Sequence, residues 1–109
     1  MTVRSSRLGA RTSSPASSVH LVVTPDGGQT VILKDVRLSF VSGTVTRCVV
    51  FTSSGATDVS LFDDPLPANS TVGFECWVVL LPGDDLNVYS EGGVVAIWAS
   101  GAILDGIAL

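Results

Sequence analysis

The fold is decided by residues 30–52, which read TVILKDVRLSFVSGTVTRCVVFT. Apolar and polar residues alternate in the first half of this stretch, a pattern typical of a β-strand with one buried face. The alternation changes phase at Lys34-Asp35, because Val31 and Leu33 lie at odd positions whereas Val36, Leu38 and Phe40 lie at even positions. This slip predicts a β-bulge or a corner between two sheets. The second half is apolar on both parities, which predicts a central strand.

Short apolar runs separated by turn residues continue over the rest of the chain from residue 19. Turns or breaks are predicted at residues 25–28, 42–43, 53–55, 63–67, 82–85 and 91–93, with 91–93 as a hairpin loop. Glycine supplies the positive φ that tight turns need, and proline donates no hydrogen bond to a sheet ladder. Seven or eight short strands at regular spacing, with no helical period, predict an all-β fold. We expect a single antiparallel β-sandwich, jelly-roll-like or immunoglobulin-like.

The 109 residues suffice for one domain. Residues 1–18 consist mainly of Ser, Thr, Arg, Ala and Gly, a composition that buries too little apolar surface to offset the entropy of ordering. We therefore predict a flexible, basic and extended N-terminal arm over residues 1–18 and a β-sandwich domain over residues 19–109.

Charge is divided unequally between these two parts. Residues 1–20 contain three arginines and no acid, whereas the remainder has three bases and ten acids, a net charge of −7. A cationic arm on an anionic body is attracted to the body of a neighbouring copy. We therefore predict that Arg4, Arg7 and Arg11 bind partners and that the chain forms homo-oligomers. Three arginines are too few for a nucleic-acid tail, and no apolar run is long enough to span a membrane.

Candidate catalytic and metal-binding residues are few. His20 is the only histidine, so a catalytic triad is not expected and His20 is predicted to lie at a strand edge or on the surface. The pairs Asp63-Asp64 and Asp84-Asp85 are predicted to be turn residues, with a hard-cation site as the less favoured alternative. Cys48 and Cys76 are predicted to be reduced, buried thiols. We expect no enzyme, no cofactor and no metal.

Aromatic residues are spread about one to a strand, which indicates core packing for most of them. Trp77, Tyr89 and Trp98 have a second interpretation, as a face that contacts glycans or partners, because aromatic rings stack on sugars and are common in interfaces.

A family resemblance is carried by residues 78–104, VVLLPGDDLNVYSEGGVVAIWASGAIL, and by TVILKDVRL at residues 30–38. Both resemble small β-sandwich virion proteins of tailed phages. The shared features are an apolar run, Pro82-Gly83-Asp84 with Leu86, a glycine-containing loop, and an apolar strand that ends in Ser100-Gly101. Pro25-Asp26-Gly27 stands where these proteins usually have Pro-Ala-Gly.

The resemblance implies membership of a phage particle, assembled in the host cytoplasm, and implies no catalytic residues. Together with the charge division, it favours a non-enzymatic structural virion protein, a minor tail or tail-tip component that contacts copies of itself and other virion proteins. A capsid decoration protein and a carbohydrate- or receptor-binding module are the alternatives.

Overall fold

Six antiparallel strands and no helix make up the described part of the chain, which confirms the predicted all-β fold. A computed structural model describes the backbone of residues 2–105 and the side chains of residues 6–105. The strands are β1 (Thr2–Thr12), β2 (His20–Val23), β3 (Gln29–Ser54), β4 (Thr57–Leu66), β5 (Thr71–Leu80) and β6 (Asp84–Asp105).

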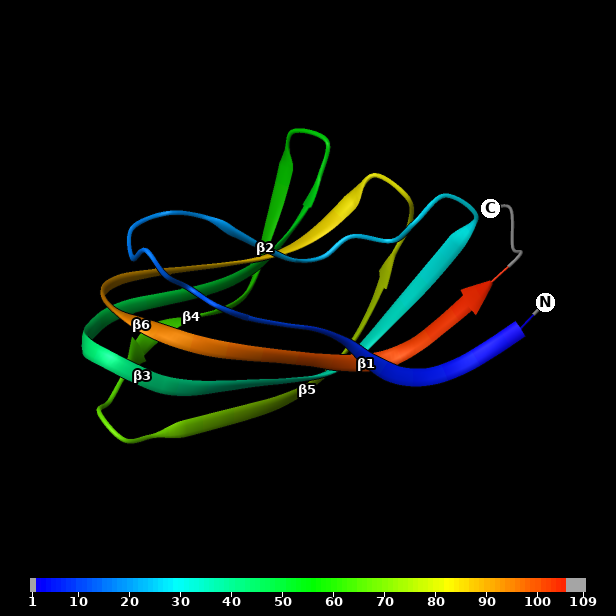
Figure 1. The fold of residues 1–109 in the computed structure, drawn as a ribbon. Helices are drawn as coiled ribbons and strands as arrows, with labels where there is room; N and C mark the ends of the chain where they lie inside the picture. Colours follow the sequence, from blue (N-terminus) through cyan, green and yellow to red (C-terminus); the bar gives the residue numbers. More distant parts are fainter. Residues whose placement is uncertain (1, 106–109) are drawn as a thin grey trace.

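The sheet folds back on itself because its two longest strands, β3 and β6, bend together at one end of the molecule (Figure 1). Residues 29–42 of β3 and 94–105 of β6 lie between β1 and β5, and we call these four segments the first layer. Residues 47–54 of β3 and 84–91 of β6 lie between β2 and β4 and form the second layer. One hydrophobic cluster contains residues of both layers, including Leu38 and Ile97 from the first and Val50 and Val88 from the second.

The bend is made by glycines that face each other on the two long strands. Gly43 of β3 is paired with Gly93 of β6, and Gly43 has a φ of +78°. A Cβ on Gly43 would lie 2.7 Å from the carbonyl oxygen of Gly92, so only glycine allows the two backbones to approach this closely. The predicted turn at 42–43 and hairpin loop at 91–93 are therefore wrong. Because both strands continue through the bend, the structure has six strands instead of seven or eight.

The irregularity predicted at Lys34-Asp35 is confirmed. Pairing of β3 with both β5 and β6 shifts register between Leu33 and Asp35, as a β-bulge requires. The prediction that residues 63–67 interrupt the sheet is wrong for Asp63 to Leu66, which belong to β4. The strand pairs with β3 on one side only, and proline is tolerated in such an edge strand.

The N-terminal segment differs from the arm predicted over residues 1–18. Residues 2–12 form β1, which pairs along the edge of β6 from Thr2 opposite Asp105 to Thr12 opposite Ala96. The physical reason is that main-chain hydrogen bonding to an open strand edge needs few apolar side chains. Leu8 adds a contact with the core.

A series of hydrogen bonds through two buried hydroxyl groups links the segment after β1 to the bend in β6. The amide of Val95 donates to Ser13 Oγ at 2.9 Å, and the Ser13 and Ser90 hydroxyl oxygens lie 2.6 Å apart. Ser90 Oγ donates to the carbonyl oxygen of Gly93 at 2.7 Å. With Ser13 donating to Ser90, every hydroxyl in this series has both a donor and an acceptor partner.

Candidate binding face

The solvent-facing side of the first layer, which we call the outer face, carries rows of residues aligned across its four strands. One row is Arg7, Ser100, Asp35 and Glu75, each directly opposite the next. The next row is Ala10, Trp98, Arg37 and Gly73. Residues directly opposite in antiparallel strands point to the same side, so charged groups and an indole ring lie together on the outer face.

Trp98 borders an open hollow of about 290 Å³ in this face. Its lining consists of Arg7, Asp35, Arg37, Trp98, Ala99 and Ser100. The Trp98 side chain is 58% exposed, although large apolar groups are usually covered. Arg37 Nε lies 3.6 Å from Asp35 Oδ2, a contact that leaves guanidinium N–H groups free to bind a partner.

A second hollow of about 320 Å³ shares Asp35 and Arg37 with the first. It is also lined by Gly73, Phe74 and Glu75, so it extends the outer face toward β5. The two hollows together offer guanidinium, carboxylate and aromatic groups, which suits recognition of a polar partner with an apolar portion.

Trp77 adds a second exposed indole at the β3 bulge. Its side chain is 67% exposed, and the Lys34 ammonium lies 5.2 Å from the ring centroid. This distance is within the range of a cation–π interaction. Trp77 projects from the same side of β5 as Glu75, and both belong to the outer face.

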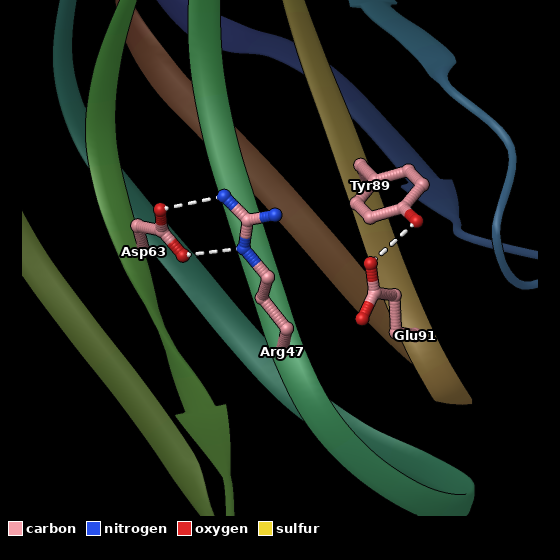
Figure 2. A network of polar contacts seen from close by, with 4 residues as sticks. All are labelled: Arg47, Asp63, Tyr89 and Glu91. Atoms are coloured by element: carbon pink, nitrogen blue, oxygen red, sulfur yellow. Dashed lines mark hydrogen bonds and ion pairs between the residues drawn. The ribbon is translucent and has the colours of Figure 1, made fainter.

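Tyr89 lies on the second layer, away from the outer face. It is paired with Val49, and its hydroxyl donates to Glu91 Oε1 at 2.7 Å (Figure 2). This hydrogen bond to a carboxylate stabilises the protonated phenol and raises the pKa of Tyr89. Trp77 and Trp98 therefore share a face, and Tyr89 does not belong to it.

Arg47 and Asp63 form an ion pair on the same side of the second layer as Tyr89 (Figure 2). Arg47 Nε and Nη2 donate to the two carboxylate oxygens of Asp63, each at 3.0 Å. These hydrogen bonds lower the pKa of Asp63 and raise the pKa of Arg47. Asp63 is a strand residue paired with arginine, so its prediction as a turn residue is wrong.

Asp84 has the predicted turn role. Its carboxylate accepts a hydrogen bond from the amide of Leu81 at 3.0 Å, and its own amide donates to the carbonyl oxygen of Leu81. Among the residues that the structure describes, no group of three His, Cys, Asp or Glu side chains is arranged to hold a metal ion.

The three predicted docking arginines have different surroundings. Arg7 is exposed on the outer face. Arg11 is used within the molecule, because Nη1 donates to the Leu21 carbonyl oxygen at 3.3 Å and Nη2 lies 3.4 Å from His20 Nδ1. The side chain of Arg4 lies outside the described side chains.

His20 is the first residue of β2, which pairs with β6 alone, so it has the predicted strand-edge position, but its side chain is buried and not on the surface. Its Nε2 lies 2.8 Å from the carbonyl oxygen of Pro15, to which it donates. Nδ1 is then the acceptor for Arg11, so the imidazole links β1, the following segment and β2.

Both cysteines are free thiols, and they differ in burial. Cys48 is fully buried, and desolvation raises the pKa of its thiol to about 11. Cys76 is half-buried, and desolvation followed by the nearby Asp35 charge raises its pKa. Thiolates are therefore scarce at neutral pH at both positions.

Four residues of the outer face were not identified from the sequence: Lys34, Asp35, Arg37 and Glu75. A signal was present, since three of the four residues at 34–37 are charged within a largely apolar stretch. Parity alone places Arg37 outward, but only the pairing with β6 brings it beside Trp98.

No protein-family model matches the chain, and comparison with curated proteins finds no similar sequence. Within residues 2–105, no helix is long and apolar enough to cross a membrane.

Proposed function

We propose that the protein is a non-enzymatic structural component of a tailed phage particle, a minor tail or tail-tip protein present in several copies. The observation that carries this proposal is the outer face, where Trp77 and Trp98 are exposed and Trp98 lies beside Arg7 and Arg37. Tryptophan and arginine are among the residue types enriched at the centres of protein interfaces. This face therefore suits permanent contact with neighbouring proteins.

The order of the strands supports the same proposal. Along the chain, β1 belongs to the first layer, β2 to the second, β3 passes from first to second, and β6 returns from second to first. This connectivity corresponds to a jelly roll, an architecture found in viral capsid proteins and also in lectins and cupins. The fold alone does not fix a function, so the virion assignment also rests on the sequence resemblance.

A carbohydrate- or receptor-binding module is the second candidate, and the hollow beside Trp98 favours it. An exposed indole with arginines at its rim suits stacking of a sugar ring and hydrogen bonding to its polar groups. The two candidates differ in what covers Trp98, which is a neighbouring protein in the first and a host glycan in the second.

The test is recovery of the protein from particles. The gene is expected to lie in a phage or prophage genome, and its product is expected to co-sediment with purified particles and to occupy fixed positions in a particle reconstruction. A handful of copies or a few rings indicates a tail protein, whereas hundreds on the shell indicate capsid decoration. Absence of the protein from complete particles overturns the structural assignment.

A further inference from the structure

The two edges of the first layer are open strands that run in opposite directions. The layer has the order β1, β6, β3, β5, and each neighbouring pair is antiparallel. An even number of alternating strands leaves the first and last antiparallel to each other. A second copy placed beside the first in the same orientation therefore brings its β5 alongside β1 in the antiparallel sense that the sheet already has.

These two edges also carry opposite charge. Residues 2–12 contain three arginines and no acid. The opposite edge strand, β5, contains one acid, Glu75, and no base, and Glu75 is exposed.

Continuing the existing rows across the contact gives one register between copies. Arg7 and Glu75 are the two ends of one row, with Ser100 and Asp35 between them. Continuing that row into a second copy places Arg7 of one molecule directly beside Glu75 of the next. The adjoining rows end in Ala10 and Gly73, and in Thr12 and Thr71, by the same pairings. Small residues avoid a clash there, and a threonine pair is a favourable cross-strand neighbour.

We propose that copies of this chain associate head to tail by strand addition, with β1 of one copy paired to β5 of the next and Arg7 beside Glu75. The proposal rests on the proposed structural function and names its partner as a second copy. The contact joins two different edges, so it is heterologous and builds a closed ring or an open filament, depending on the rotation between copies. The second layer contributes less, because Pro65 removes a donor from the β4 edge.

Charge reversal tests the contact on the full chain by sedimentation velocity over a concentration series at low salt. Wild-type protein is expected to form oligomers larger than dimers. Arg7→Glu and Glu75→Lys are each expected to weaken association about tenfold or more, since each places like charges side by side. Asp26→Lys is the matched control, because Asp26 lies in the exposed turn between β2 and β3 and its substitution changes net charge equally to Glu75→Lys.

A mixture of the two reversed variants provides the decisive measurement. In each variant alone, positions 7 and 75 of neighbouring copies carry like charges. In a mixture in which the two variants alternate, position 7 and position 75 carry opposite charges at every contact. Association is therefore expected to return in the equimolar mixture and in the double variant, which misfolding would not allow. Circular dichroism of each variant checks that the sheet is intact.

The proposal is overturned if the wild-type protein is monomeric at all concentrations, or if the mixture associates no better than its components. Such a result leaves the structural function standing when the protein is still recovered from particles. Conversely, self-association as expected with no recovery from particles refutes the virion assignment and retains the strand contact.

Discussion

The hydroxyl chain of Ser13 and Ser90 shows how single polar residues stabilise the bend. Both side chains are fully buried, and removal of the Ser90 hydroxyl leaves the buried Ser13 O–H without its acceptor and the Gly93 carbonyl oxygen without its donor. Ser90→Ala is expected to lower the free energy of unfolding by about 1–3 kcal/mol. Urea denaturation measures the change, with Ser18→Ala as a control at an exposed position. Equal stabilities of the two variants would contradict the role given to Ser90.

A second residue-scale prediction concerns pH. Arg47 lowers the pKa of Asp63 in the folded state, so the pair contributes stability above the ordinary pKa of aspartate and loses it as pH falls through the lowered value. Asp63→Asn is expected to reduce stability slightly at neutral pH and to have no effect in strong acid. Thermal unfolding from pH 7 to pH 2 tests this, with the neighbouring Asp64→Asn as control. A difference that persists unchanged into acid would refute the ion-pair explanation.

At the scale of elements, the glycines of the bend keep β3 and β6 continuous. Gly43→Ala adds a Cβ close to the carbonyl oxygen of Gly92 and forces alanine into a positive φ. We expect a loss of roughly 1–3 kcal/mol. Gly27→Ala is the matched control, since a Cβ there meets no atom within 4 Å and its φ is not positive. Comparable unfolding midpoints for both variants would show that the bend does not require glycine at position 43.

Sequence patterns identified some elements and missed others for definite reasons. The bulge at Lys34-Asp35 was predictable because side-chain parity records which face of a strand is buried. The bends of β3 and β6 were not predictable, because glycines such as Gly43 and Gly93 occur both in hairpin turns and where one strand bends into another layer. The strand β1 was missed because its pairing uses main-chain groups, which composition does not report. Deleting β1 would remove a strand from the sheet and so disturb the fold. Arg7→Glu is therefore the better test of docking.

At the scale of the whole molecule, the unequal division of charge could be predicted from the sequence, but the positions of the charged strands in the sheet could not. The sequence predicts a basic segment and an acidic remainder. Only the strand order shows that the basic β1 and the strand that carries Glu75, β5, are opposite edges of one layer. The pairing of Trp98 with Arg37 likewise joins residues 61 positions apart in the chain, beyond the reach of local patterns.

The continuity of β3 and β6 through the bend has a mechanical consequence. In a sandwich whose layers are joined only by loops, a pull perpendicular to the layers is resisted by side-chain packing. Here two strands cross from one layer to the other side by side, hydrogen-bonded along most of their length. Such a pull at that end is therefore opposed by two covalent backbones in regular strand structure, whereas at the opposite end the layers are joined by the loops at residues 24–28 and 81–83.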